Sequence, residues 1–203
     1  MTEDVDRRRS APAVARNRGH ILEVLRRVLP ERGHVLEVAA GTGEHAVYFS
    51  AALPGLAWHP SDADPVCLES IEAWRKAEGT ENLLAPVRLD ATSPTWPVGR
   101  VDAVFNANMI HISPWEACLG LLAGASRHLR EGGALVLYGP YRLEGRHTAP
   151  SNEAFDADLR SRNPAWGVRD LEAVLEAALA EGLDFEERVE MPANNQTVVL
   201  RRR

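Results

Sequence analysis

The sequence predicts an α/β fold in which a mostly parallel sheet is covered by helices on both faces. Short apolar runs alternate with helical stripes along most of the chain, and this order is typical of parallel strands joined by helical crossovers. A loop containing Gly41 and Gly43 follows the first apolar run and precedes a helix. The segments 185–190 and 197–201 alternate apolar with polar residues and have no helix between them, which indicates a hairpin. We therefore expect a Rossmann-like, seven-stranded, mostly parallel sheet with an antiparallel C-terminal hairpin.

Apolar spacing, glycine and proline predict the bounds of the elements. Apolar residues recur with helical spacing over 21–29, where Pro30 and Gly33 follow, and the run HVLEVAA (34–40) is typical of a buried strand that ends at Gly41. The other expected strands are 56–61, 83–89, 101–107 and 134–138, and the other expected helices are 44–53, 65–77, 114–129 and 170–180. We expect the Gly132-Gly133 pair to stop the helix 114–129.

The length of the chain suits one domain, and we expect residues 1–203 to form it. Residues 1–30 should supply a polar leading segment and a helix. Residues 142–170 are long for a connection in such a fold, so we expect an insertion or lid, polar and irregular through 168, with a short helix near 153–160.

Composition excludes several classes of protein. The net charge of -6 disfavours a nucleic-acid partner, because such proteins usually carry a basic surplus. Cys67 and Cys118 lie in expected helices, outside any CxxC spacing, so we expect reduced thiols and no metal site. Neither a signal peptide nor a membrane-spanning run is visible, so we expect a cytoplasmic protein. The sequence leaves the oligomeric state, monomer or homodimer, open.

The glycine loop carries the strongest functional signal. Gly41 and Gly43 permit a sharp turn and close approach of a ligand to the backbone, beside the positive end of the next helix. With Ala46 they also fit a dinucleotide-binding fingerprint, and a purely structural turn is a further alternative. Glu37 distinguishes these, because a buried carboxylate repels a diphosphate and favours a cationic ligand. The alternative is a structural role in which neighbouring backbone N–H groups donate hydrogen bonds to the Glu37 carboxylate.

The run Leu36-Glu37-Val38 followed by Gly41-Thr42-Gly43 resembles the first motif of the class I S-adenosylmethionine-dependent methyltransferases. The resemblance implies S-adenosylmethionine as the cofactor, with its amino-acid end near Glu37, Gly41 and Gly43. It also implies that Asp62 binds the ribose and that Asp90 accepts from the adenine. The residues that the resemblance places at the cofactor are Glu37, Gly41, Gly43, Asp62, Asp90, Ala91 and Asn106. A helix cap at Asp62 or Asp64, with Asp64 favoured, and a turn at Asp90 are the alternatives.

The chain from Ala11 onward is also similar to a narrower group, the DUF938 (UPF0585) methyltransferase-like proteins. The strings that carry this similarity are APAVARN (11–17), WHPSD (58–62), NMIHI (108–112), YGPY (138–141), SNEAFD (151–156), WGVRD (166–170) and MPANN (191–195). This similarity implies the methyltransferase fold and supplies no substrate.

Residues after the fourth and fifth expected strands should face the methyl acceptor. His111 is a candidate general base, since its ordinary pKa is about 6.5, and Tyr138 is a second catalytic candidate. His111 packed on the adenine or capping a helix, and Tyr138 buried in a strand, are the alternatives. The candidate substrate-binding residues are Asn108, Tyr141, Asn152, Asp156, Trp166 and Arg169. For the residues within 142–170, an ion pair between Asp156 and Arg160 on one helix and a helix cap at Arg169 or Asp170 are the alternatives to substrate binding.

These features together favour a methyltransferase that uses S-adenosylmethionine and a small-molecule acceptor. A regulatory or interaction protein that binds the cofactor without turnover is the alternative, because the same motif would serve it. A nicotinamide-dependent oxidoreductase fits less well, since Glu37 is unfavourable beside a diphosphate.

Overall fold

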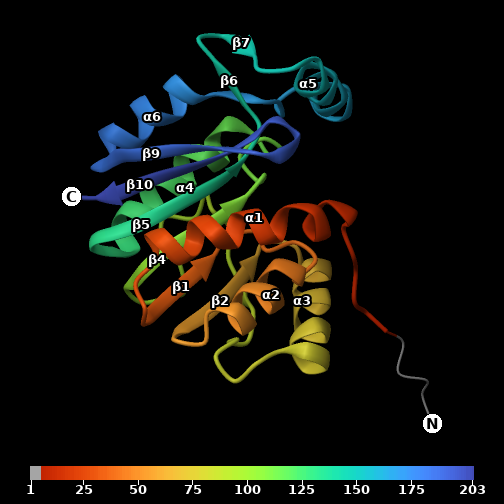
Figure 1. The fold of residues 1–203 in the computed structure, drawn as a ribbon, viewed down its shortest axis with the longest axis vertical. Coiled ribbons are helices and arrows are strands. Elements are labelled where there is room, and N and C mark those ends of the chain that lie inside the picture. Colours follow the sequence, from red (N-terminus) through yellow and green to blue (C-terminus); the bar gives the residue numbers. More distant parts are fainter. Residues whose placement is uncertain (1–5) are drawn as a thin grey trace.

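A computed structural model describes residues 6–203, and its centre is a seven-stranded sheet with the order β3-β2-β1-β4-β5-β10-β9 (Figure 1). The strands are β1 (Gly33–Glu37), β2 (Leu56–Asp62), β3 (Val87–Arg88), β4 (Val101–Ala107), β5 (Leu129–Gly139), β9 (Leu183–Met191) and β10 (Asn195–Arg202). The pairs among β1 to β5 are parallel, whereas β10 is antiparallel to both β5 and β9. The predicted fold, including the closing hairpin, is confirmed.

Helices cover both faces of the sheet and create two apolar cores. The helices are α1 (Pro12–Val28), α2 (Glu44–Ala52), α3 (Pro65–Glu78), α4 (Trp115–His128), α5 (Pro150–Arg162) and α6 (Leu171–Ala180). One core packs α1 and α2 on the sheet through Ile21, Leu25, Phe49 and Trp58. The other core packs α4 and α6 on the opposite face through Leu121, Leu122 and Val174. Alternate residues of each strand therefore serve different cores, as buried parallel strands require.

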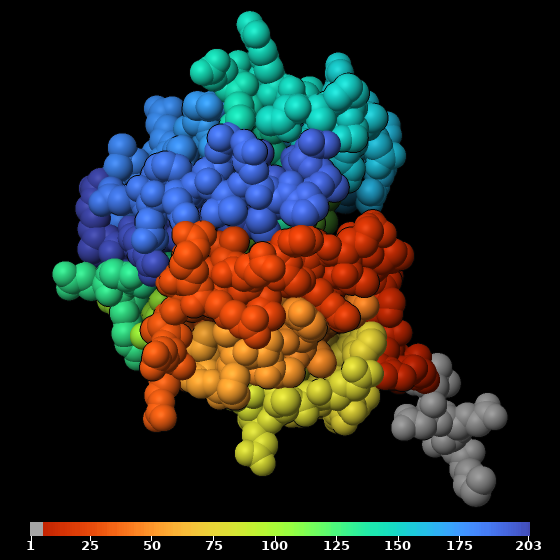
Figure 2. Space-filling view, in the orientation of Figure 1, coloured from red at the N-terminus to blue at the C-terminus, as the bar shows by residue number. Residues whose placement is uncertain are grey.

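Helix α1 lies between the other N-terminal helices and the C-terminal hairpin. In Figure 2 its surface separates that of α2 and α3 from that of the C-terminal hairpin. It begins at Pro12, with proline in its first turn, whereas the sequence pattern predicted a start near Ile21. The additional turns contain few apolar residues, and Val14 and Asn17 are the buried side chains among them. Helical spacing of apolar residues could not reveal a segment held by polar contacts.

Two predicted strand bounds are wrong. The third strand is reduced to Val87–Arg88, and only an isolated bridge joins Leu83 to Trp58. Strand β5 begins at Leu129, directly after α4, so Gly132 and Gly133 lie inside a strand and do not stop the helix. The register between β4 and β5 shifts at this point, and Gly132 has a φ of +71°. The glycine pair therefore accommodates an irregularity in the strand.

The stretch 142–168 is more ordered than its polar composition predicted. A second, three-stranded sheet has the order β7-β6-β8, formed by β6 (Tyr141–Leu143), β7 (Arg146–His147) and β8 (Arg169–Asp170). The short helix predicted near 153–160 is the longer α5. Figure 1 shows β6, β7 and α5 together at one end of the molecule, beyond the main sheet. The prediction of an irregular stretch is therefore wrong, because strands of two or three residues leave no periodic signal.

Among residues 6–203, no helix combines the length and apolar character that crossing a bilayer requires. Both cysteines lie in helices, as predicted: Cys67 is half-buried in α3 and Cys118 is buried in α4.

Candidate functional site

The loop between β1 and α2 has the backbone conformation that its glycines predicted. Gly41 has a φ of +59° and Gly43 a φ of +93°, both in the region that favours glycine. A Cβ at Gly43 would lie 2.8 Å from the Cα of Ile71, so close packing with α3 requires this glycine. A Cβ at Gly41 would meet no other atom within 4 Å. Gly41 therefore faces open space that a ligand can occupy.

Asp62, the last residue of β2, is held directly beside this loop. Its Oδ2 accepts a hydrogen bond of 2.9 Å from the N–H of Gly41, and its Oδ1 accepts one of 2.9 Å from the N–H of Asp64. Each carboxylate oxygen retains a further lone pair for a ligand hydroxyl. Burial raises the pKa of Asp62, and the N–H groups of Asp64 and Gly41 act in the opposite direction. Asp64 caps α3 by accepting from the N–H of Val66 at 2.9 Å, which confirms its predicted cap.

Glu37 is buried at the end of β1 on the face covered by α1 and α2. Its Oε2 accepts a hydrogen bond of 2.6 Å from the indole N–H of Trp58. Burial, together with the nearby Asp62 carboxylate, raises the pKa of Glu37 to about 8, while the Trp58 bond lowers it. The carboxyl group therefore retains its proton near neutral pH until a cation approaches.

The ends of β1 to β4 are joined by backbone hydrogen bonds around the loop. Val38 donates to the carbonyl of Phe105 at 2.9 Å, and Leu89 donates to the carbonyl of Asp62 at 3.0 Å. Asp90 follows Leu89, and its Oδ1 accepts from the N–H and the hydroxyl of Thr92 at 2.9 and 2.8 Å. That contact is the turn that the sequence left open for Asp90. Ala91 is buried beneath it.

Asn106 is buried at the end of β4, beside the first strand. Its Nδ2 donates to the carbonyl of Val38 at 2.8 Å, and its Oδ1 has no partner among the described residues. The predicted cofactor residues thus lie at or just after the carboxyl ends of the parallel strands.

The N-terminal half of α1 contributes a polar contact that the sequence analysis did not find. Asn17 Oδ1 lies 2.8 Å from Nε2 of His45, in the first turn of α2. Burial lowers the pKa of His45 to about 4, so its ring is neutral and its Nε2 donates to Asn17. This contact fixes the start of α2, and therefore the glycine loop, against α1. His45 lies two residues after Gly43, and this position next to the glycine loop was the sequence signal that could have indicated a role for it.

The residues before α1 lie across the same loop. The N–H of Ala11 donates to Glu44 Oε2 at 2.6 Å, and the N–H of Arg9 donates to Ser70 Oγ at 2.9 Å. Ser70 in turn donates to the carbonyl of Thr42 at 2.7 Å. The leading segment is therefore bonded to the glycine loop and to α3.

His111 is buried against β5 and does not have the environment of a general base. Burial and the nearby Arg169 guanidinium lower the pKa of His111 to about 3. The backbone N–H of Arg169 points at Nδ1 at 3.4 Å, so Nδ1 accepts and Nε2 carries the hydrogen. His111 thus presents a neutral donor. Tyr138, the other catalytic candidate, lies in the opposite core, since it precedes Gly139, against which His111 packs.

Among the substrate candidates, Asn108 is half-buried directly after β4 and has a φ of +63°, an unusual conformation for a residue other than glycine. Tyr141 is wholly buried in the core beneath α4, where its ring contacts that of His111 with centroids 5.0 Å apart. Burial raises the pKa of Tyr141. Of these two candidates, Asn108 exposes surface to a ligand.

The other four candidates hold the segment 142–170 in place. Asn152 donates to the carbonyl of Asn194 at 2.9 Å, which joins α5 to the turn before β10. Asp156 accepts from Arg160 at 3.0 Å, the helix pair that the sequence left open, and from the N–H of Val168 at 2.7 Å.

The guanidinium of Arg169 donates to the carbonyls of Ile110, Ser113 and Ala165. Trp166 is half-buried, with the guanidinium of Arg162 over its ring at 5.2 Å. Side-chain groups of Asn152, Asp156 and Arg169 are therefore engaged within the protein.

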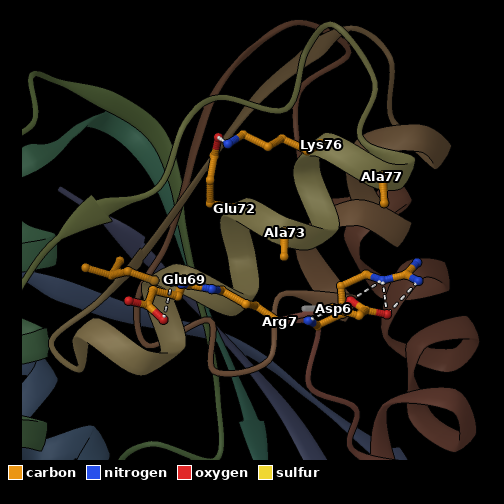
Figure 3. A pocket seen from close by; sticks show the side chains of 9 residues that line it. Asp6, Arg7, Glu69, Glu72, Ala73, Lys76 and Ala77 are labelled. Atoms are coloured by element: carbon orange, nitrogen blue, oxygen red, sulfur yellow. Dashed lines mark hydrogen bonds and ion pairs between the residues drawn. The ribbon is translucent and has the colours of Figure 1, made fainter. Parts of the chain in front are cut away.

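A cavity of about 850 Å³ lies elsewhere, between the leading segment and α3 (Figure 3). Its charged walls are already paired, with Arg7 3.0 Å from Glu69 and Lys76 3.6 Å from Glu72. None of the predicted site residues lines it. We therefore do not assign the functional site to this cavity.

Comparison with known families identifies the chain. The profile described as "Protein of unknown function (DUF938)" matches residues 8–202. The chain belongs to the DUF938 family. The similarity that the sequence strings indicated is thus confirmed over nearly the whole chain.

Solved structures of methyltransferases share the fold of this DUF938 protein. A putative O-methyltransferase from Nostoc punctiforme PCC 73102 is 17% identical with a TM-score of 0.82, over 94% of this chain and 57% of that one. The S-adenosylmethionine-dependent methyltransferase SibL is 22% identical with a TM-score of 0.76, over 94% and 55%. CalO1, a methyltransferase of calicheamicin biosynthesis in its SAH-bound form, is 18% identical with a TM-score of 0.71, over 92% and 54%. The DUF938 chain spans little more than half the length of each, and the likeness establishes the class I methyltransferase fold.

Proposed function

We propose that this DUF938 protein is an S-adenosylmethionine-dependent methyltransferase that methylates a small molecule. The observation that carries the proposal is the contact between the Asp62 carboxylate and the N–H of Gly41, beside the open space that Gly41 faces. An acid at the end of β2 and an exposed backbone at the end of β1 fit the ribose and the amino-acid end of such a cofactor. The fold shared with solved methyltransferases supports the same assignment.

The residues of the site fit a cationic nucleoside better than a dinucleotide. Glu37 is buried with one neutral donor, Trp58, and a second acid, Asp62, nearby. A diphosphate would add negative charge to this pair, whereas an α-ammonium group would stabilise the ionised form of Glu37. We propose Glu37, Gly41, Gly43, Asp62 and Asn106 as the cofactor-binding residues, with Asp90 and Ala91 next to the adenine.

Bound S-adenosylmethionine would supply an electrophilic methyl group on its sulfonium. The chain itself would hold the acceptor in line and exclude water, and positioning of this kind contributes roughly 7–11 kcal/mol to a barrier. The segment 142–170 covers His111 and would provide the exclusion. Asn108, half-buried after β4, is proposed to contact the acceptor.

Proton removal by a side chain is not part of the proposed mechanism. Nδ1 of His111 is occupied by the N–H of Arg169, and Tyr138 is buried at the end of β5. Burial raises the pKa of Tyr138, so its phenol keeps its proton at neutral pH. We therefore propose that both residues orient neighbouring groups, and that catalysis relies on positioning.

Calorimetry with S-adenosylhomocysteine tests the cofactor assignment. Asp62→Asn should weaken binding by at least about tenfold, because the loss of a charged acceptor in a partly buried site costs about 1.5–3 kcal/mol. Asp64→Asn is the matched control two residues away, since asparagine caps a helix as well as aspartate, and should leave binding unchanged. Absence of heat with folded wild-type protein at millimolar ligand would refute the proposal.

A second experiment tests turnover. Wild-type protein is incubated with cofactor labelled in its methyl group and a metabolite extract, and the small-molecule fraction should become labelled. Label in tRNA or protein fractions would contradict the assignment of a small acceptor. Tight binding without any labelled acceptor would instead favour a cofactor-binding regulatory protein.

A further inference from the structure

On the face covered by α4 and α6, several buried side chains have a polar atom without a partner within residues 6–203. Tyr141 Oη and Trp96 Nε1 are two of these atoms, and three others belong to residues near Gly139. These atoms are Asn106 Oδ1, His111 Nε2 and Gln196 Oε1. All three side chains are more than nine-tenths buried. An unsatisfied buried polar atom destabilises a protein, so three in one region need a common explanation.

The strand register places the three atoms around Gly139. Asn106 pairs with Leu137 from one side of β5, and Gln196 pairs with Gly139 from the other side. Paired residues and residues two apart in a strand share a face, so both amides flank β5 on the same face. His111 lies over Gly139, because a Cβ at that position would lie 2.5 Å from its Nε2 and 3.1 Å from Oδ1 of Asn108. The absence of a side chain at Gly139 makes room for this arrangement.

The three atoms differ in what they offer a ligand. His111 offers a donor at Nε2, since its Nδ1 accepts from the N–H of Arg169. Asn106 offers an acceptor, because its Nδ2 already donates to Val38. Gln196 offers a second acceptor. A hydroxyl group has one hydrogen, so it can accept from His111 Nε2 and donate to Gln196 Oε1, and Asn106 Oδ1 is left for the cofactor.

The charged groups near this set are already paired. The Arg169 guanidinium donates to backbone carbonyls, and Asp156 is bonded to Arg160 and to the N–H of Val168. The remaining titratable neighbours, Tyr141 and Cys118, are buried, and burial raises the pKa of each. Neither a carboxylate nor an ammonium group would therefore find a free counter-charge here.

We propose that His111 and Gln196 form the binding site for an uncharged hydroxyl group of the methyl acceptor. This inference rests on the proposed function and specifies its substrate class as a neutral molecule that carries an alcohol or phenol hydroxyl. The hydroxyl bound here keeps its proton and serves for recognition, so the methyl group is transferred to a different atom of the acceptor. Leu137 and Val198, which pair with each other on the same face, supply apolar surface next to the polar atoms.

The site is covered by the segment 142–170, which contacts both of its ends. The N–H of Gly167 donates to the His111 carbonyl at 2.9 Å, and Asn152 holds the carbonyl of Asn194, two residues before Gln196. The acceptor would therefore enter while this segment is displaced and be enclosed when the contacts re-form. Such enclosure agrees with the exclusion of water that methyl transfer requires.

Four aromatic probes of similar size test the proposal, namely benzyl alcohol, benzylamine, benzoate and toluene. Their binding to the full chain is measured by ligand-observed NMR, with and without S-adenosylhomocysteine. Benzyl alcohol should bind most tightly. Gln196→Leu should weaken benzyl alcohol by about tenfold relative to toluene, because one hydrogen bond to a buried group is lost.

Thermal unfolding of the free protein supplies a second readout. Gln196→Leu should raise the melting temperature by about 2–4 °C, since an unpaired buried acceptor is removed. Gln196→Met serves the same purpose if the leucine variant does not fold. Thr197→Val is the matched control, because Thr197 Oγ1 is also buried and unpaired but faces the opposite core. It should not change the preference for benzyl alcohol.

The outcomes separate the two proposals. Equal binding of the four probes, a preference for benzoate or benzylamine, or an unchanged alcohol preference in Gln196→Leu would overturn the hydroxyl site. A rise in melting temperature without any alcohol preference in the wild type would indicate a buried water only, and would overturn it as well. Failure of S-adenosylhomocysteine to bind in the same samples would refute the proposed function independently of these results.

Discussion

At the scale of single residues, the glycine loop contains a strained position. Ala39 has a φ of +55°, and an L-residue in this region costs about 1–2 kcal/mol relative to the right-handed one. Its side chain is only half-buried, so little packing opposes its removal. The strain lies two residues before Gly41, where the backbone must turn toward the proposed cofactor.

Ala39→Gly should therefore be neutral or stabilise the protein by up to about 1 kcal/mol, since relief of strain exceeds the entropy that glycine loses on folding. Urea unfolding monitored by tryptophan fluorescence measures this difference. Ala40→Gly is the matched control, because Ala40 is buried and has no positive φ, and it should be destabilising. Equal destabilisation by both substitutions would show that Ala39 is not strained.

At the scale of elements, the start of α1 organises the site through one buried hydrogen bond. Asn17→Ala should leave the Nε2–H of His45 without its acceptor and destabilise the protein by about 1–3 kcal/mol. Because His45 opens α2, binding of S-adenosylhomocysteine should also weaken. Calorimetry and urea unfolding measure the two effects, with His20→Ala on the exposed side of the same helix as the control. Unchanged affinity in a destabilised Asn17→Ala protein would contradict the coupling of α1 to the loop.

Elements with strong periodic patterns were predictable from the sequence, and those held by polar contacts were not. Strands β1, β2 and β4 each contain a short apolar run, and Pro65 with Asp64 marks the start of α3, so their bounds were close. The early start of α1 depends on Asn17, and the small sheet of β6 to β8 depends on pairings between distant residues. Such contacts become visible only when the chain is folded.

The candidate site divides in the same way. Glu37, Gly41 and Asp62 lie at strand ends, and the rule that ligands bind beyond these ends predicted their proximity. The protonation state of His111 and the unpaired Gln196 depend on Arg169 and Gly139, which lie far from them in the sequence. The residue type of His111 suggested a general base, whereas the packing around its ring indicates a neutral hydrogen-bond donor.

At the scale of the whole molecule, buried titratable groups should determine how stability depends on pH. Burial lowers the pKa of His45 to about 4 and of His111 to about 3, from an ordinary value of 6.5. The unfolded chain therefore binds more protons than the folded protein below pH 6.5, and stability falls as the solution is acidified. Glu37 acts in the opposite direction, because its pKa is raised from 4.5 to about 8. The folded protein then holds the extra proton, and stability falls as pH rises toward 8.

These opposing effects predict a maximum of stability near pH 6.5, where the histidines have become neutral in both states and Glu37 is still protonated in the fold. Between pH 6.5 and 8, the free energy of unfolding should fall by about 2 kcal/mol. Glu37→Gln should abolish this alkaline loss while weakening S-adenosylhomocysteine, because a neutral amide cannot stabilise an α-ammonium group. Urea unfolding at a series of pH values measures the profile, with Glu23→Gln on the exposed side of α1 as the control. If the free energy of unfolding of Glu37→Gln still falls between pH 6.5 and 8, another group causes that fall. The electrostatic reason for a cationic cofactor at this site would then be removed.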